Sequence, residues 1–451
     1  MPRRAILACL FPLLALALTR STDASPRDDS PRFLYTTAKS YEPLAWMRGG
    51  ERFGSGATIF VHDQSGEHPL VAEFAASADP ALSFDGHRVL FAAKRKMEDS
   101  WQIWELSLDG GNPRRVSSEP EDCIRPFYLP EDRIVYARRV EGRFVIESAP
   151  LAGGKPLPLT YSPANSVPTD VLRDGRVLFE SEYSFGSPSI PEIYTVYSDG
   201  SGVEAYRCDH GRARYSARQI SSGDVVFISG QTLARFTSAR AQQLPISAPP
   251  GEYAGDVAEF QDGRLLLSWR PDAQSQFRLM AWSSGAANLS SVLADASVNL
   301  IQPVLLGPHV VPNRHPSGLH DWPSANLLCL NAYTSKYEFA PASIHSVRLY
   351  TRDEAGNPRS LGTALVEQDG SFFVQILGDQ PLQIELLDSS GKTLKREAGY
   401  FWMRRGEQRV CVGCHAGPET APENAVPMTL LKSTTPADMT GASRPAAAGG
   451  H

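Results

Sequence analysis

A strand-turn-strand unit recurs along the first two thirds of the sequence, and this repeat restricts the possible folds more than any other feature. The units alternate short apolar runs with tight turns and occupy residues 79–95, 123–139, 167–182, 215–230 and 254–270, with a degenerate sixth at 301–311. A unit of about four short strands cannot bury both of its faces alone, but units that repeat every roughly 40 to 50 residues can stack radially as propeller blades. The sequence therefore predicts a six-bladed β-propeller over residues 57–306.

Two alternatives to a six-bladed propeller remain open from the sequence. Strands within residues 33–56 would add a seventh blade, and an accidental spacing of similar units would produce a β-sandwich. Residues 103–120, which read IWELSLDGGNPRRVSSEP, resemble the propeller repeats of the periplasmic Tol-system protein and its relatives. That resemblance concerns the type of repeat and is silent on chemistry.

The repeat ends and the sequence pattern changes after residue 307. Three prolines, at positions 308, 312 and 316, indicate a stiff crossing segment. Strand-like runs then follow at residues 326–333, 346–350, 364–368, 371–376, 382–387 and 399–403. Asp369-Gly370 between two of these runs is a typical hairpin turn. We expect a small antiparallel β-sandwich over residues 307–403, which makes the whole chain all-β.

A C-x-x-C-H pentapeptide, Cys411-Val412-Gly413-Cys414-His415, follows the last of these strands. This motif is the attachment signature of c-type haem, whose vinyl groups react with the two thiols while the histidine ligates iron. The sequence predicts one covalent haem c, attached at Cys411 and Cys414, with His415 as the iron ligand. The attachment segment would span residues 404–440, and residues 441–451 have the composition of a disordered tail.

The pentapeptide has two other interpretations, half of a zinc site and a thioredoxin-like dithiol. A zinc site needs a second ligand pair, and the sequence has no second C-x-x-C. A thioredoxin-like dithiol usually precedes a helix in a βαβ unit, and little helical pattern follows here. Among the other cysteines, Cys123 and Cys208 could form a disulfide in an oxidising compartment.

The N-terminus has the pattern of an export signal, which haem c attachment outside the cytoplasm requires. Arg3 and Arg4 precede an apolar run over residues 5–18, and Thr22 and Ala24 are small residues suited to signal peptidase. The run is too short for a membrane span. We expect a signal peptide at residues 1–24, a periplasmic or extracellular location, and residues 25–56 as a segment that joins the propeller.

Charge and hydropathy exclude several classes of partner. The net charge is −6, and no basic block stands out, so neither nucleic acid nor an anionic membrane is an expected partner. After the signal no apolar run is long enough to span a bilayer, so no membrane span is expected in the mature chain.

Residues 307–440 resemble a known family. The runs Val366 to Val374 (VEQDGSFFV), Pro381-Leu382-Gln383, and Tyr400 through GEQRV to CVGCH are similar to the middle domain of the hydrazine synthase alpha subunit. The run at residues 422–427 (PENAVP) fits the wider set of proteins that join a propeller to this haem domain.

The resemblance implies a periplasmic multidomain protein with a c-type haem and, if it is an enzyme, a haem-dependent oxidoreductase. It does not imply hydrazine synthesis, because this sequence holds a single C-x-x-C-H and resembles a single-haem relative. In the hydrazine synthase alpha subunit, the resemblance implies that the middle-domain haem is an open catalytic site with a tyrosine ligand four residues after the motif histidine. Glu419 occupies that position here, so the family's iron ligation and catalysis do not carry over directly.

The second iron ligand decides between electron transfer and catalysis, since an open position permits ligand binding. The candidates for this second ligand are Met428, Met439, a linker histidine or no residue at all. The linker histidines are His309, His315 and His320. Together with Asp321, which is close to them in the sequence, they could instead form a separate metal site. Three arginines could pair with haem propionates or be ordinary surface charges: Arg404, Arg405 and Arg409. Trp402 and Met403 are expected to pack against the edge of the macrocycle.

These observations predict a periplasmic haem-c redox protein that transfers electrons or performs small-molecule redox chemistry at one haem. Its partner would be an unidentified redox protein or a small substrate, with a protein partner also expected on the propeller face. The alternative is a propeller interaction or scaffold protein in which the C-x-x-C-H is structural or vestigial.

Overall fold

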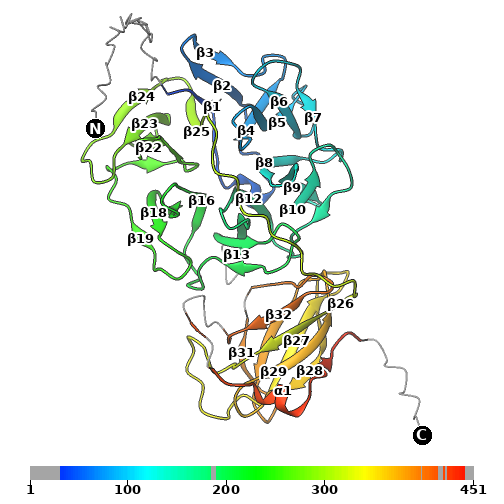
Figure 1. Ribbon diagram of the computed structural model, residues 1–451. Coiled ribbons are helices and arrows are strands. Elements are labelled where there is room, and N and C mark those ends of the chain that lie inside the picture. The colour runs from blue at the N-terminus through cyan, green and yellow to red at the C-terminus, as the bar shows by residue number, and fades with distance from the viewer. Residues whose placement is uncertain (1–30, 184–188, 398, 415–419, 422–423, 442–451) are drawn as a thin grey trace, which may run out of the picture. The chain divides into compact units, whose positions relative to one another are not determined.

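The computed structural model describes residues 31–183, 189–397, 399–414, 420–421 and 424–441. The predicted signal peptide, the predicted disordered tail from residue 442, His415 and Glu419 lie outside the described residues. The segment Pro31–His451 forms one compact unit. Figure 1 shows its two successive parts, a ring of small sheets followed by a sandwich.

Six sheets form the blades of a β-propeller, as the repeat predicts (Figure 1). The strands of blades 1 to 3, in order across each sheet, are β25 (Asn299–Leu305), β1 (Phe33–Ala38), β2 (Thr58–Asp63) and β3 (Gly66–Pro69); β4 (Ala76–Leu82), β5 (Arg88–Lys94), β6 (Gln102–Ser107) and β7 (Arg114–Arg115); and β8 (Cys123–Leu129), β9 (Arg133–Val140), β10 (Arg143–Pro150) and β11 (Leu157–Pro158).

Blades 4 to 6 follow the same antiparallel plan. Their strands are β12 (Ser166–Val171), β13 (Val177–Tyr183), β14 (Ile190–Val196) and β15 (Glu204–Ala205); β16 (Arg214–Gln219), β17 (Val225–Ser229), β18 (Thr232–Phe236) and β19 (Leu244–Pro245); and β20 (Glu252–Tyr253) with β21 (Ala258–Glu259), both paired to β22 (Leu265–Arg270), then β23 (Arg278–Trp282) and β24 (Ser290–Leu293). A short 3-10 helix, Ala45–Arg48, separates β1 from β2.

The two ends of the propeller sequence close the ring in one blade. Strand β1 pairs antiparallel with β25, so that Phe33 lies opposite Leu305 and Ala38 lies opposite Asn299. The strand before residue 57 therefore completes the first blade and does not add a seventh.

Buried charges join the inner strands at the centre of the ring. Asp79 of β4 and Arg125 of β8 have positive φ values of 58° and 53° at bulges in the ladder. Arg52 donates to both Asp79 carboxylate oxygens at 2.7 and 2.6 Å, and Arg125 donates to both Asp256 oxygens at 3.1 and 3.0 Å. Burial alone would raise the pKa of Asp79, but the charge and hydrogen bonds of Arg52 hold that pKa at about 2.

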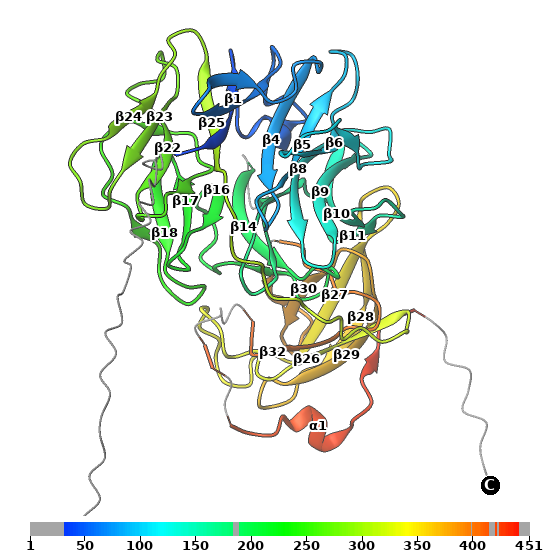
Figure 2. The same cartoon turned by 45° about the horizontal axis from the view of Figure 1, so that its top comes forward.

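The second part is a sandwich of two four-stranded sheets (Figure 2). One sheet has the order β32 (Gln408–Cys411), β26 (Ser324–Cys329), β29 (Phe372–Leu377), β33 (Ala437–Asp438), and the other has the order β28 (Pro358–Leu365), β27 (Ser346–Arg352), β30 (Gln383–Leu387), β31 (Thr393–Arg396). The pairs β26–β29, β27–β28 and β27–β30 are antiparallel, as expected, whereas β32 and β33 join their sheet in parallel. A short helix, α1 (Met428–Lys432), lies between β32 and β33 in the chain.

Trp402 connects the sandwich segment to the core of the propeller. Its side chain is 2% exposed and belongs to the largest apolar cluster of the propeller. Its Nε1–H donates to the Gly200 carbonyl at 3.0 Å, and its ring packs against Tyr161 and Phe179. Met403, the next residue, points the other way into the sandwich core. Neither side chain lies on a free surface, because each fills one of the two cores.

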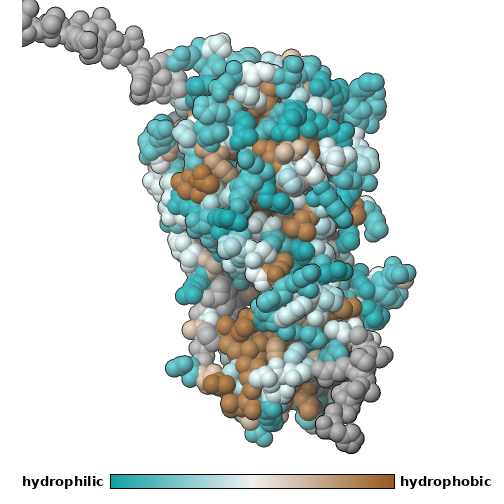
Figure 3. Space-filling model, turned by 45° about the vertical axis from the view of Figure 1, so that its right-hand side comes forward, coloured by the Kyte–Doolittle hydropathy of each residue, from teal (hydrophilic) through white to brown (hydrophobic). Residues whose placement is uncertain are grey.

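Among the described residues, no helix is long and apolar enough to cross a membrane. Large apolar side chains are nevertheless exposed on the sandwich, and Figure 3 shows hydrophobic side chains gathered on the lower part of the visible face. The exposed large apolar side chains of the sandwich and its C-terminal segment include Tyr337, Leu365, Leu377, Val410, Val426 and Leu431.

Candidate functional site

Strand β32 fixes the start of the C-x-x-C-H motif at the edge of a sheet. Its last residue, Cys411, lies in register with Cys329, the last residue of the neighbouring parallel strand β26. The ladder continues for one step, because the Leu330 N–H donates to the Cys411 carbonyl at 2.9 Å. Figure 2 shows β32 beside β26, and this strand pairing sets the backbone position of Cys411.

Gly413 brings the motif into direct contact with the turn at residues 331–334. A Cβ atom at Gly413 would overlap the Thr334 carbonyl oxygen and would lie 2.8 Å from the Asn331 carbonyl oxygen. Both obstacles are backbone atoms, which cannot rotate away as a side chain can. A larger residue at this position would push the two cysteines away from the sandwich.

The two motif thiols are half-buried and free. Neither Cys411 nor Cys414 forms a disulfide, and both pack against the apolar core of the sandwich. Burial raises the pKa of the Cys411 thiol, and burial together with the Glu397 carboxylate raises that of Cys414 to about 12. The thiols are therefore protonated at neutral pH.

The donor set fits a covalently attached haem as far as the structure describes it. Two free thiols are available. Val412 and Gly413 separate them, and Gly413 lets this loop lie directly against the backbone of Asn331 and Thr334. The proximal ligand predicted from the sequence, His415, lies outside the described residues. Within residues 31–414 and the described C-terminal stretches, no group of three or more His, Cys, Asp or Glu side chains could hold a metal ion.

The three arginines near the motif are engaged with the protein. Arg404 is 8% exposed, donates to Asp379 Oδ1 at 2.7 Å and contacts the Asp199 carbonyl. Arg409 donates to Glu407 Oε1 at 2.9 Å. Arg405 has the most exposed side chain of the three, at 67%, and lies 3.5 Å from Asp379. Arg405 is therefore the arginine best placed to meet an external anion.

The two candidate methionines differ in their surroundings. Met439 is 3% exposed and belongs to the apolar core of the sandwich. Met428 begins α1, and its backbone N–H donates to Asp369 Oδ2 at 2.7 Å. Met439 thus contributes to packing, whereas Met428 is the more accessible of the two.

The linker histidines lie on separate aromatic rings. His309 lies against Phe84 with ring centroids 5.3 Å apart. His315 stacks on Tyr197 at 3.7 Å, and His320 stacks on Trp322 at 4.4 Å. The sequence places these histidines and Asp321 together, but the structure does not gather them into a metal site.

Cys123 and Cys208 do not form the disulfide that the sequence left open. Neither cysteine is part of a disulfide. Cys123 starts β8 and is fully buried, while Cys208 follows β15 in the next blade, where its carbonyl accepts a hydrogen bond from Lys336 Nζ at 2.6 Å.

A cavity of about 310 Å³ lies beside Trp402, and sequence reasoning did not predict it. Blade 4 and the adjoining loop supply one side, and the sandwich supplies the other. The lining residues are Ser162, Pro163, Ala164, Phe179, Ser181, Glu182, Tyr194, Arg352, Gln383, Gly399, Tyr400 and Trp402. No local pattern could reveal this site, because its residues come from several separate parts of the chain.

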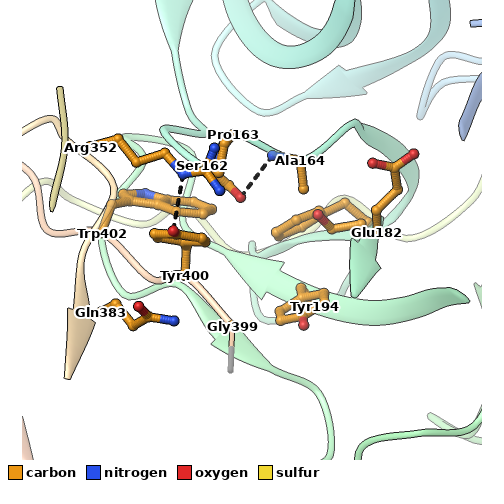
Figure 4. Close-up of a pocket in the computed structure, with 12 residues that line it drawn as sticks. Ser162, Pro163, Ala164, Glu182, Tyr194, Arg352, Gln383, Gly399, Tyr400 and Trp402 are labelled. Atoms are coloured by element: carbon orange, nitrogen blue, oxygen red, sulfur yellow. Dashed lines mark hydrogen bonds between the residues drawn. The ribbon is translucent and has the colours of Figure 1, made fainter. Parts of the chain in front are cut away.

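Opposite charges lie on the two sides of this cavity. Arg352 Nε donates to the Tyr400 hydroxyl at 3.0 Å on one side, and Glu182 and Tyr194 lie on the other (Figure 4). Burial raises the pKa of Glu182, and its hydrogen bonds with Asn165 oppose this effect. The cavity can admit a small polar molecule, and the structure shows no nucleophile–base pair within it.

A family model described as the hydrazine synthase alpha subunit middle domain matches residues 339–416. Hydrazine synthase subunit alpha of Kuenenia stuttgartiensis is 29% identical over 92 residues, which make up 20% of this chain and only 11% of that protein. The solved structure of Kuenenia stuttgartiensis hydrazine synthase superposes with a TM-score of 0.77 at 17% identity. It covers 89% of this chain and 71% of the matched chain. The chain is therefore a relative of the hydrazine synthase alpha subunit in its fold and in its middle domain.

Proposed function

We propose that this protein is an exported c-type haem redox protein that carries one haem on residues 404–440. The observation that carries the proposal is the C-x-x-C-H motif, with two free thiols at the end of β32, inside the segment that matches the hydrazine synthase alpha middle domain. The predicted signal peptide supports a periplasmic or extracellular location, where haem c is attached.

The residues of the motif would hold the cofactor as follows. Haem c would supply a redox-active iron; Cys411 and Cys414 would hold the haem through thioether bonds, and His415 would ligate the iron. The β32–β26 ladder positions Cys411. Gly413 allows the loop to lie against Asn331 and Thr334, and the sandwich core excludes water from one side of both thiols.

Electron transfer is the proposed role, and small-molecule redox chemistry is its alternative. Of the candidates for the second iron ligand, Met439 is buried in the core of the sandwich. The remaining candidates are Met428, a linker histidine or an open position.

Expression with a cytochrome c maturation system tests the proposal. We expect haem that survives denaturation and gives a c-type pyridine haemochrome spectrum. Cys414→Ala should abolish attachment of intact c-type haem, and Cys123→Ala, which changes a buried thiol in the propeller, should not. Absence of covalent haem in the wild-type protein would favour the propeller scaffold interpretation.

Carbon monoxide separates the two redox roles. Rapid binding to the ferrous protein would indicate an open sixth position and small-molecule chemistry. An unchanged ferrous spectrum would indicate two strong axial ligands and an electron carrier. Comparison with Met428→Leu then shows whether that methionine is the second ligand.

A further inference from the structure

Three cysteine thiols lie around the same edge of the sandwich, although they are far apart in the sequence. Cys329 ends β26 and lies in register with Cys411 at the end of β32. Cys414 packs against the same apolar core as the other two. All three are free, and they do not form a metal-binding group in the described chain. Cys329 is thus a third thiol beside the two that the motif uses.

The strand pairing holds Cys329 and Cys411 at a separation suited to a covalent bond. Neighbouring strands lie roughly 4.8 Å apart, and residues in register point to the same face of a sheet. A disulfide joins residues whose Cα atoms are about 4.4 to 6.8 Å apart. The hydrogen bond from Leu330 N to the Cys411 carbonyl holds these strand ends in place.

We propose that Cys329 and Cys411 form a disulfide in the protein before haem attachment, and that this disulfide prevents attachment until it is reduced. Cys329 is then a redox-controlled modification site next to the motif. The consequence for haem rests on the proposed function, whereas the disulfide itself needs no haem.

The reaction uses an external disulfide, either a small molecule or a periplasmic dithiol oxidase, as the oxidant. The Cys411 thiolate is the first to react, because its side chain is partly exposed while Cys329 is 3% exposed. It attacks the external disulfide, forms a mixed disulfide and displaces one thiol. The Cys329 thiolate then attacks the Cys411 sulfur and displaces the second thiol. Two electrons pass to the oxidant, and the two cysteine protons end on the released thiols.

The product blocks haem attachment because thioether formation at Cys411 requires a free thiol. Cys414 competes with Cys329 for Cys411, since the two cysteines of a C-x-x-C pair can also form a disulfide with each other.

The rate of disulfide formation should depend on pH. Burial raises the pKa of Cys329 well above its ordinary range, and thiolates are the attacking species. Disulfide formation should therefore be slow at neutral pH and faster as the pH rises.

Peptide mapping tests the disulfide directly. Full-length protein made without haem would be treated with glutathione disulfide at pH 7 and pH 9, alkylated, digested and analysed by mass spectrometry. We expect a linked Cys329–Cys411 peptide pair that forms faster at pH 9, is absent from Cys411→Ser, and is unchanged in Cys123→Ser. A Cys411–Cys414 link alone, or three alkylated thiols, would overturn the proposal.

Haem loading tests the consequence. Cells with the maturation system would be grown with oxidised or reduced glutathione, and covalent haem per protein would be measured. The wild-type protein should lose several-fold more haem under oxidant than Cys329→Ala or the similarly sized Cys329→Ser; equal losses would overturn the blocking role. If no protein carries haem even under reductant, the proposed function fails while the mapping result still decides the disulfide.

Discussion

Glu180, buried beside the charged centre of the propeller, should make this protein less stable as the pH rises above 4.5. Its side chain lies in β13, is 3% exposed, and accepts a hydrogen bond from Ser216 N at 2.6 Å through Oε1. Burial raises the pKa of Glu180 from 4.5 to about 7, opposed by the charge of Arg125 and the Ser216 hydrogen bond. The folded protein thus keeps a proton on Glu180 that the unfolded chain releases.

The sign and size of the effect follow from proton linkage. Between pH 4.5 and pH 7 the folded state binds more protons at Glu180 than the unfolded state does, so the free energy of unfolding falls as the pH rises through this window. Each pH unit of pKa difference corresponds to about 1.36 kcal/mol, so the loss amounts to about 3 kcal/mol above pH 7.

Glu180→Gln should remove this loss. Glutamine stays neutral at every pH, and its amide oxygen can still accept the hydrogen bond from Ser216 N. Urea unfolding followed by tryptophan fluorescence at pH 5 and pH 8 would measure the difference. We expect the advantage of the variant over wild type to be larger at pH 8 than at pH 5 by up to about 3 kcal/mol.

Glu147 provides the matched control for this prediction. It is equally buried, but both of its oxygens accept hydrogen bonds from Arg138, at 2.9 and 2.7 Å. Glu147→Gln removes the negative charge that compensates Arg138 and should destabilise the protein at both pH values. The reasoning is refuted if the stability difference between Glu180→Gln and wild type is the same at pH 5 and pH 8.

Three further changes test the packing around the ring and the motif. Trp402→Ala removes a buried ring and its hydrogen bond to Gly200; it should cost about 3 to 5 kcal/mol in urea unfolding, and a cost below about 1 kcal/mol would contradict its role in the core. Asp79→Asn leaves Arg52 without its charge partner and should lower stability by about 3 to 5 kcal/mol in the same assay; an unchanged urea midpoint would refute this. Gly413→Ala should reduce the amount of covalent haem per protein while leaving the circular dichroism spectrum of the protein unchanged. Gly318→Ala is the control and should carry as much haem as wild type, because a Cβ there meets no atom within 4 Å.

The propeller was predictable because its signals are local. Each unit places a turn between two apolar runs, and glycines such as Gly86 and Gly175 occupy those turns with positive φ values of 79° and 89°. Ring closure leaves no such signal, because β1 and β25 pair across more than 250 residues of chain. The buried charges are equally non-local: Arg52 comes from outside the regular strands, and nothing in its immediate sequence identifies Asp79 as its partner.

The C-x-x-C-H motif was visible in the sequence, but its surroundings were not. A turn at Asp369-Gly370 follows from local turn chemistry, and the Gly370 N–H donates to the Glu367 carbonyl there. The hairpin expected at this turn is wrong, because β28 before the turn and β29 after it lie in different sheets. Parallel pairing of β32 with β26 depends on contacts between segments that are 82 residues apart. The in-register position of Cys329 and Cys411 could therefore be found only in the folded chain, as could the cavity beside Trp402.

Glu407 explains how the propeller influences the position of the motif. One of its oxygens, Oε1, accepts hydrogen bonds from Gly202 N of blade 4 at 3.2 Å and from Arg409 of β32 at 2.9 Å. The other accepts from Arg404 N at 2.7 Å. Since Glu407 is 6% exposed, these bonds are shielded from water and are stronger than exposed ones. The strand that carries Cys411 is consequently bonded to the propeller and the sandwich at once, so a change in blade 4 can alter the position of the motif without touching it.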